Sequence, residues 1–368
     1  MKLTSKEKKK LLFLRANPRK TGFSEKLFNL FIEGAEEFVD VVDIDLTKVA
    51  LSPCLGCYHC WTNTPGTCVQ HDSMGPIIEH FKTADLMVVA TPLYAFGVSS
   101  YCKMFLERTF PLLAPGIVLN ERNIEQNKLR YPDCKPSSMA VLLVGGLKSS
   151  SHAAGAVKSL ESYAEGFGMN FGGALVRTES YILQFAGTKP KTIKNIEHAF
   201  FQAGAEFAGC GCISKEMSDK AALQLAPDID YFGKYSNIYW HYASDVSKRG
   251  GSVDEAMELT DRDPWILMHE MARSIDPVAT KGLKATFQFE FDDIASVFTI
   301  VVDKGKCSIT EASAEKPDIV IKSGSQIWVG VLRRELDPLK QLTSGKVLLS
   351  GDKSLFRKLH LYFPPPGL

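Results

Sequence analysis

The chain has 368 residues, more than one ordinary hydrophobic core accommodates, which predicts two or three folding units. Its net charge of +1, with 45% hydrophobic and 23% charged residues, is typical of a globular protein and favours neither nucleic acid nor an anionic membrane as a partner. No stretch approaches the ~20 apolar residues of a membrane span, and the early apolar run Leu11–Leu14 is too short for a signal peptide. Nine cysteines, four of them clustered, fit a reducing cytoplasm better than a secreted disulfide framework.

The first 210 or so residues alternate between strand and helix patterns. Strands are predicted at 10–16, 38–46, 85–91, 138–144 and 174–179, and helices at 24–37, 75–83, 153–167 and 193–208. Because the strands are apolar along both faces, they predict a parallel sheet covered by helices on both sides. The expected fold class is therefore α/β, with a doubly wound, five-stranded parallel sheet.

A polar loop follows the first predicted strand and leads directly into a helix. Free backbone N–H groups and the positive end of the helix dipole make such a loop a phosphate site. It lacks the glycine patterns of dinucleotide and nucleoside triphosphate loops, so a monophosphate such as that of FMN suits it. The candidate ligands are Asn17, Arg19, Thr21, Gly22, Phe23 and Ser24. Many such loops carry Ser and Gly only for helix capping, which is the alternative.

Two further loops are expected at the same edge of the sheet, where open α/β sheets bind their ligands. The third strand ends in Pro92, Leu93, Tyr94, Ala95, Phe96 and Gly97, and the fourth ends in Gly145 and Gly146. Tyr94 and Phe96 are expected to flank a flat ring, and the two adjacent glycines permit its close approach to the backbone. An aromatic cluster that serves only the core is the alternative.

Four cysteines crowd into residues 54–68 with the spacing C-x2-C-x2-C-x7-C: Cys54, Cys57, Cys60 and Cys68. This compact run is typical of [4Fe–4S] ligands and is poor for structural zinc, which usually takes two separated pairs. Free thiols beside a flavin are the alternative, and His59 and His71 are interpreted as structural or solvated residues. The other five cysteines lack ligand spacing and are expected to be buried small hydrophobic residues: Cys102, Cys134, Cys210, Cys212 and Cys307.

These motifs resemble the flavodoxin-like NAD(P)H-dependent FMN reductase and iron–sulfur flavoprotein family. The similar stretches are residues 17–24, 53–60, 65–74 and 91–94. The resemblance implies FMN, with its phosphate on the first loop and its ring at the other two, NAD(P)H as co-substrate, a [4Fe–4S] cluster on the cysteine run, and a homo-oligomer. The chain departs from the family pattern at Asn17, where Ser is usual, and at Ser73, within the usual Asp-Asp-Met.

The composition changes after Gly209. Residues 213–275 are rich in aromatics and predict helices from Ser252 to Leu259 and after Pro264; they either bridge two domains or form a plain helical hairpin. An α+β pattern follows, with strands at 285–291, 297–302, 307–311, 318–322 and 347–350, and helices at 325–334, 336–343 and 353–359.

The C-terminal stretches 282–291, 303–307, 316–321 and 344–352 resemble the sterol carrier protein type 2 domain. This resemblance implies an apolar tunnel for fatty-acyl or sterol ligands. Five apolar residues either line such a cavity or fill an ordinary core: Trp328, Val329, Val331, Leu332 and Leu336. The predicted domains are a flavodoxin-like domain at 1–212, a helical aromatic-rich linker at 213–278 and a sterol-carrier-type domain at 279–368.

The predicted function is that of an NAD(P)H-dependent FMN oxidoreductase. Electrons would pass to a quinone-like, flavin or apolar acceptor, by way of a cluster if the cysteines hold one. No acid–base catalyst is assigned, because a flavin itself performs the difficult chemistry. Two alternatives are a non-enzymatic electron-transfer iron–sulfur flavoprotein and a lipid-binding module whose flavin domain acts as a sensor.

Overall fold

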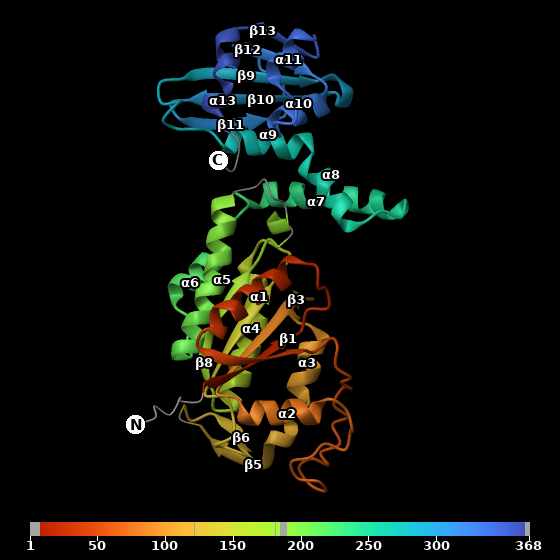
Figure 1. Cartoon of the computed structure of the whole chain (residues 1–368), viewed down its shortest axis with the longest axis vertical. Helices are drawn as coiled ribbons and strands as arrows, with labels where there is room; N and C mark the ends of the chain where they lie inside the picture. Colours follow the sequence, from red (N-terminus) through yellow and green to blue (C-terminus); the bar gives the residue numbers. More distant parts are fainter. Residues whose placement is uncertain (1–7, 121, 181, 185–189, 365–368) are drawn as a thin grey trace, which may run out of the picture. The chain divides into compact units, whose positions relative to one another are not determined.

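The computed structural model describes residues 8–120, 122–180, 182–184 and 190–364 (Figure 1). The chain divides into two compact units, residues 1–184 with 192–226, and residues 185–191 with 227–368. The aromatic-rich segment 213–278 is thus shared between the two units. That residues 213–278 form a separate linker between two domains remains a prediction.

The first unit is built on five parallel strands in the order β2–β1–β3–β7–β8. These are β1 (Lys9–Arg15), β2 (Val39–Asp45), β3 (Leu86–Tyr94), β7 (Ser138–Val144) and β8 (Asn170–Arg177). Counting only parallel strands, the order is 2-1-3-4-5, the flavodoxin-like doubly wound topology. The predicted fold class is confirmed. The short strand β4 (Gly97–Val98) adds an antiparallel turn to the end of β3.

Helices cover both faces of this sheet because successive strand residues point to opposite sides. They are α1 (Phe23–Glu36), α2 (Met74–Thr83), α3 (Ser100–Glu107), α4 (Ala154–Gly166), α5 (Pro190–Cys210) and α6 (Lys215–Ala221). On one face, Leu12 and Leu14 of β1 join a core with residues of α2, α3 and α4. On the other face, Phe13 packs against Phe28 and Phe31 of α1, with ring centroids 6.5 and 6.1 Å apart.

Helices α1 and α5 cross in close contact through a pair of glycines (Figure 1). A Cβ on Gly34 would lie 1.9 Å from the Phe201 carbonyl oxygen, and one on Gly204 would lie 2.0 Å from the Phe31 carbonyl oxygen. No real side chain tolerates such distances, so the two backbones approach this closely only because both positions lack one.

A two-stranded hairpin between α3 and β7 was not predicted. It consists of β5 (Leu113–Leu119) and β6 (Glu125–Leu129), with a register shift between Ala114 and Ile117. Helices α3 and α6 were also missed, and β8 begins four residues earlier than its predicted strand. These differences leave the strand order of the main sheet unchanged.

The second unit contains a five-stranded sheet in the order β11–β10–β9–β12–β13. Its strands are β9 (Lys284–Phe291), β10 (Ser296–Asp303), β11 (Lys306–Thr310), β12 (Ile319–Ser323) and β13 (Val347–Gly351). Only β9 and β12 pair in parallel. The accompanying helices are α9 (Pro264–Arg273), α10 (Ser325–Leu332), α11 (Pro338–Thr343), α12 (Lys353–Arg357) and α13 (Leu359–Tyr362). This confirms the α+β pattern predicted for the C-terminal region.

Two more helices of this unit precede α9: α7 (Ile229–Lys248) and α8 (Val253–Asp261). Asp228 caps α7 by accepting a hydrogen bond from the Tyr231 amide, 2.7 Å away. The buried aromatics Tyr231, Tyr235 and Tyr239 recur every fourth residue, so they lie on one face of the helix. Within the described ranges, no helix has both the length and the apolarity that crossing a bilayer requires.

Candidate functional site

Three loops of the first unit meet at the carboxyl ends of β1, β3 and β7. The Ser99 hydroxyl, just beyond the β3 turn, donates to the Ala16 carbonyl at the end of β1, 2.7 Å away. A Cβ on Gly145 would lie 3.2 Å from Leu93 Cδ2, so the loops after β3 and β7 are also in contact. The loops therefore form one continuous edge. This is the position expected for loops that follow parallel strands. Their role in holding a cofactor remains a prediction.

The loop after β1 presents the start of α1 to this edge. Gly22 is the N-cap residue and supplies no side-chain cap, so the first-turn amides of α1 are the groups that a phosphate would meet. Of the predicted ligands, Arg19 and Thr21 are exposed, Gly22, Phe23 and Ser24 are half-buried, and Asn17 is buried.

Asn17 lies beneath the loop and not on its open side. Its Nδ2 group donates to the Arg19 carbonyl (3.0 Å) and to Glu25 Oε2 (2.8 Å). Both hydrogens of the amide are thus engaged inside the protein. Its Oδ1 atom is buried and has no hydrogen-bond partner among the described residues. Asn17 therefore braces the loop in this arrangement, while the backbone amides remain the candidate phosphate donors.

Ion pairs behind this loop were missed by the sequence analysis. Buried Arg15 lies 2.8 Å from both a Glu25 oxygen and an Asp43 oxygen, and Lys20 lies 2.9 Å from Asp45. The pairs neutralise carboxylates that would otherwise repel an anion at the start of α1. Two aspartates at the end of β2, Asp43 and Asp45, could have indicated these ion pairs, because β2 runs beside β1.

The turn after β3 has an unusual backbone. Tyr94 pairs with Gly97, and the two residues between them, Ala95 and Phe96, have positive φ values of 47° and 62°. Two successive positive φ angles define a type I′ turn, which ordinarily takes Asn and Gly. Placing Ala and Phe there costs roughly 1–3 kcal/mol per residue, and such strain tends to occur at functional sites.

This turn holds two aromatic side chains toward solvent, with Tyr94 49% and Phe96 61% exposed. The Phe96 ring lies 5.2 Å from that of His152, which belongs to a short 3-10 turn, Ser150–Ala153, after the glycine loop. His152 was not a predicted site residue, and a lone His in a Ser-rich stretch gives no clear signal. The turn thus presents two aromatic side chains at the edge, and His152 adds a third ring beside Phe96. Their role beside a flat ring remains a prediction.

Buried charges hold the glycine loop after β7. Glu179 and Arg177 are both 0% exposed, and their side chains lie 3.0 Å apart. The second Glu179 oxygen lies 2.8 Å from Lys148 Nζ. The Gly145 amide donates to the Arg177 carbonyl (2.8 Å), and Gly145 in turn accepts from the Ser180 amide (3.1 Å). This network fixes where the glycine backbone lies at the edge.

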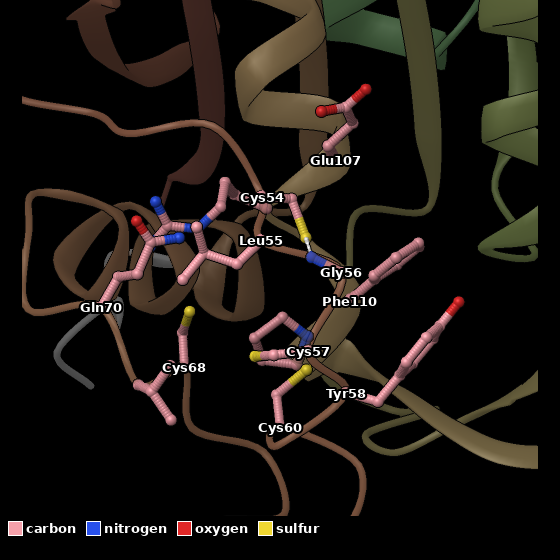
Figure 2. Close-up of a pocket in the computed structure, with 13 residues that line it drawn as sticks. Cys54, Leu55, Gly56, Cys57, Tyr58, Cys60, Cys68, Gln70, Glu107 and Phe110 are labelled. Atoms are coloured by element: carbon pink, nitrogen blue, oxygen red, sulfur yellow. Dashed lines mark hydrogen bonds between the residues drawn. The ribbon is translucent and has the colours of Figure 1, made fainter.

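The four clustered cysteines line one pocket (Figure 2). Its volume is about 20 Å³, room for roughly one water molecule. Cys57 is exposed, Cys54 and Cys68 are half-buried, and Cys60 is buried. Burial, followed by the charges of its three neighbouring thiols, raises the pKa of Cys60. The sequence prediction that these thiols gather at one place is consistent with this arrangement.

As arranged in this structure, the four thiols are not positioned as the ligands of one metal ion. Across the part of the chain that the structure describes, no three or more His, Cys, Asp or Glu side chains are placed to hold a metal ion. Figure 2 shows the Cys54 sulfur beside the Gly56 amide, from which it accepts a hydrogen bond at 3.4 Å. The donor set of the cysteine run consists of four thiols, which are the usual ligands of an iron–sulfur cluster. His59 and His71 are exposed, in agreement with their interpretation as solvated residues.

Arg108, at the end of α3, anchors the cysteine loop. Its guanidinium donates to the Ser52 carbonyl (2.7 Å) and to both oxygens of Asp72 (2.6 and 2.9 Å). Its side chain is only 1% exposed. Arg108 was not predicted as a site residue, because nothing around position 108 suggests that its partners lie 36 and 56 residues earlier.

An aromatic cluster anchors the same loop from its other side. Trp61 contacts both Tyr58 and Phe110, with ring centroids 5.2 and 5.7 Å away, and those two rings stack on each other at 6.4 Å. The Trp61 indole N–H donates to the Phe110 carbonyl oxygen at 2.9 Å. The cysteine run is therefore attached at both ends to rigid parts of the unit, while its tip remains open to solvent.

The second unit contains a cavity of about 990 Å³. Its apolar wall includes four of the five residues named from the sequence: Trp328, Val331, Leu332 and Leu336. Val329 is 1% exposed and lies in the core outside this wall. Glu270, 5% exposed, contributes a carboxylate that accepts from the Tyr231 hydroxyl at 2.6 Å and pairs with Arg273. A cavity of this size and lining suits a largely apolar small molecule.

Two family models match the chain. Residues 9–174 match the NADPH-dependent FMN reductase family, and residues 269–363 match the SCP-2 sterol transfer family. An iron–sulfur flavoprotein of Methanocaldococcus jannaschii is 32% identical over 104 residues, which are 28% of this chain and 53% of the relative. An iron–sulfur flavoprotein of Archaeoglobus fulgidus is 26% identical over 103 residues, covering 28% and 46%. The chain spans about half the length of the curated relatives it matches.

Solved structures similar to the chain include an azoreductase from Bacillus anthracis, at 21% identity and a TM-score of 0.40, covering 54% of this chain and 98% of the other. A second is an NAD(P)H:quinone oxidoreductase from Methanothermobacter marburgensis, at 15% identity and a TM-score of 0.40, covering 54% and 99%. The chain thus joins a segment that matches the NADPH-dependent FMN reductase family to one that matches the SCP-2 sterol transfer family, and the resemblance predicted for both is confirmed.

Proposed function

We propose that the chain is an NAD(P)H-dependent FMN oxidoreductase. The observation that carries the proposal is the contact among three loops at the carboxyl edge of the sheet, two of them joined by the Ser99–Ala16 hydrogen bond. The edge combines uncapped helix amides, an exposed aromatic turn and a glycine loop, which are the features that a phosphorylated flat ring requires. The match of residues 9–174 to an FMN reductase family supports the same assignment.

Each loop has a separate task in this proposal. The first turn of α1, after Gly22, binds the phosphate, assisted by the nearby Arg19. Tyr94 and Phe96 flank the ring, and the backbone at Gly145 and Gly146 lies against it. FMN, when bound, supplies the chemistry of accepting a hydride from NAD(P)H and releasing electrons to an acceptor. The protein binds and orients, so no acid–base residue is assigned.

We further propose that Cys54, Cys57, Cys60 and Cys68 hold a [4Fe–4S] cluster. Support comes from their shared pocket and from the curated iron–sulfur flavoproteins that the chain resembles. The proposal requires the 54–60 loop, whose residues 55–59 are exposed, to close so that all four sulfurs face one point. The cluster, when bound, supplies one-electron transfer, and buried Arg108 beside Cys68 compensates part of its negative charge.

The acceptor belongs to the same proposal and is a quinone-like, flavin or apolar molecule. The 990 Å³ cavity favours the apolar class, because its wall is mainly aliphatic and aromatic and would hold a lipid or sterol-like ligand. It also favours a second candidate function, a lipid-binding module whose flavin domain acts as a sensor. A cytoplasmic location and a homo-oligomeric state remain predictions from sequence.

The decisive experiment is an absorption spectrum of the protein purified without oxygen. We expect the two bands of oxidised flavin together with the broad, featureless absorption of an iron–sulfur cluster. A Cys57→Ser variant should lose the cluster absorption and keep the flavin bands, and Cys134→Ser is the matched control that should keep both. A protein that stays colourless after incubation with FMN, and does not oxidise NADH or NADPH, contradicts the enzymatic proposal.

A substitution in the cavity wall tests the apolar ligand separately. We expect Leu332→Gln to weaken binding of a fluorescent fatty-acid probe about tenfold, because a polar amide then faces the chain of the probe (about 1.4 kcal/mol). Leu348→Gln is the matched control, since Leu348 is 55% exposed on β13 and lies outside the cavity wall. Equal probe affinity for both variants and for the unchanged protein would place the ligand elsewhere.

A further inference from the structure

The C-terminal end of α5 carries two thiols in contact. The sulfurs of Cys210 and Cys212 lie 2.8 Å apart, and both residues are exposed. Five cysteines were predicted from the sequence to be buried small hydrophobic residues. This is wrong for Cys210, Cys212 and Cys134, which are exposed, whereas Cys102 is buried as expected and Cys307 is half-buried. A disulfide bond measures about 2.05 Å, so these sulfurs need to approach by only ~0.8 Å to bond.

The turn between the two thiols is held in place by the sheet. Gly211 has a φ of +72°, and a Cβ at this position would lie 3.2 Å from Ser138 Cβ. Its carbonyl accepts from the Ser138 hydroxyl at 2.6 Å, and the Ile213 amide donates to the Gly172 carbonyl at 2.7 Å. Because these hydrogen bonds fix the backbone of the turn, the two sulfurs are held near each other.

Glu206 adds a further constraint one helical turn earlier. Its carboxylate accepts hydrogen bonds from both the amide (2.8 Å) and the hydroxyl (3.0 Å) of Ser214. The Cys210 thiol also lies 3.1 Å from the Glu206 carbonyl oxygen. The chain therefore folds back on itself across residues 206–214, with the two thiols at the outer side of the bend.

This bend lies at the opposite end of the sheet from the flavin loops. Ser138 is the first residue of β7, and Gly172 lies near the start of β8, so the bend sits at the amino edge. The loops proposed to hold FMN follow the carboxyl ends of the same parallel strands. The thiol pair is consequently separate from the flavin edge, and neither cysteine lines the four-cysteine pocket.

We propose that Cys210 and Cys212 form a reversible redox site that exchanges with small-molecule disulfides. The thiolate of one cysteine attacks a sulfur of the disulfide, forms a mixed disulfide and releases one thiolate. The second cysteine, as thiolate, attacks the protein sulfur of that mixed disulfide, closes the Cys210–Cys212 bond and releases the second thiolate. Two electrons pass from the cysteine pair to the small disulfide, and the two protons pass to the released thiolates or to solvent.

The chain offers a direct test, because trypsin cleavage after Lys194 and Lys215 yields a peptide in which Cys210 and Cys212 are the only cysteines. The native full-length protein is incubated with oxidised glutathione, its free thiols are alkylated, and the digest is analysed by mass spectrometry. We expect peptide 195–215 to carry no alkyl groups. Its mass should be about 2 Da below that of the same peptide with two free thiols, because two hydrogens are lost when the disulfide forms. Reduction with dithiothreitol followed by a second alkylation should convert it to the doubly alkylated form.

Three variants make the result specific. Cys212→Ser should eliminate the light peptide and leave glutathione on Cys210, whereas Cys134→Ser should leave the peptide result unchanged. Gly211→Ala should slow closure, because its positive φ and the Ser138 contact disfavour a side chain there. A doubly alkylated peptide, a stable glutathione adduct in the unchanged protein, or a disulfide to another peptide would overturn the proposal. Flavin retention, measured on the same samples, should not change and reports on the FMN proposal independently.

Discussion

Replacing Glu179 by Ala is expected to lower the free energy of unfolding of the first unit by about 3–5 kcal/mol, the usual cost of breaking a buried ion pair. Glu179 and Arg177 are both 0% exposed, so the remaining guanidinium would stay inside without a counter-charge. Burial already lowers the pKa of Arg177 to about 10, which reflects how poorly this position solvates a cation. Lys148 would lose the same partner.

The substitution should also disturb the glycine loop. Glu179 Oε2 accepts from the Leu225 amide at 2.7 Å, and the neighbouring Ser180 amide donates to the Gly145 carbonyl at 3.1 Å. Urea unfolding followed by far-ultraviolet circular dichroism measures the stability, and equilibrium dialysis measures FMN retention. The matched control is Glu216→Ala, because Glu216 pairs with Lys220 on the surface, where solvent screening leaves such a pair with little effect on stability. Equal unfolding midpoints for the two variants would contradict the structural role of the network.

The core elements of both sheets could be predicted because their signals are local. Strands such as β3 and β7 are apolar at nearly every position, which identifies a strand covered on both faces. The alternation in β9 likewise identified a strand with one buried face. The alternation of these strands with helices then favoured a doubly wound, five-stranded parallel sheet, whereas the strand order comes from the structure.

The elements that were missed have weaker local signals. Helix α7 contains many aromatic residues with modest helix propensity, and it forms because Tyr231, Tyr235 and Tyr239 bury one face. Their four-residue spacing was available in the sequence and indicates a helix once it is noticed. The hairpin of β5 and β6 exposes Ile117 and Leu119, so it lacks the buried face on which strand prediction depends.

The candidate site was predictable only in part. The positions of the three loops follow from chain order, since parallel strands place their carboxyl ends at one edge. The contacts that stiffen this edge were not predictable, because they join residues such as Ser99 and Ala16, which lie 83 positions apart. The contacts of Asn17 were not predictable either. Its sequence position suggested a phosphate ligand, but its amide donates to the Arg19 carbonyl and to Glu25.

Replacing Asp72 by Ala is expected to destabilise the first unit by about 3–5 kcal/mol and to loosen the cysteine loop. Asp72 receives two hydrogen bonds from Arg108 and one each from the amides of Ser52 (3.1 Å) and Met74 (3.1 Å). Burial alone raises the pKa of Asp72, but these hydrogen bonds outweigh it and hold the pKa below its ordinary value. The carboxylate is therefore ionised at neutral pH and joins the start of the cysteine loop to α2 and to the end of α3.

Two measurements separate loosening of the loop from general unfolding. Urea denaturation gives the stability. The rate at which Cys54, Cys57 and Cys68 react with a chromogenic disulfide reagent, below the unfolding transition and with the exposed Cys134, Cys210 and Cys212 replaced by Ser, reports on the loop itself. The control Asp219→Ala should leave both unchanged, because Asp219 is exposed and pairs with the surface residue Lys215.

A double substitution decides whether the cost comes from an unpaired charge. In Asp72→Ala with Arg108→Leu, the buried cation at position 108 is also removed, so we expect part of the lost stability to return. The thiols should nevertheless stay more reactive than in the unchanged protein, because the hydrogen bonds from Arg108 to the Ser52 carbonyl and to Asp72 are absent in that variant. If the double variant is less stable than Asp72→Ala alone, Arg108 stabilises the loop mainly by packing, and the account of a buried ion pair is wrong.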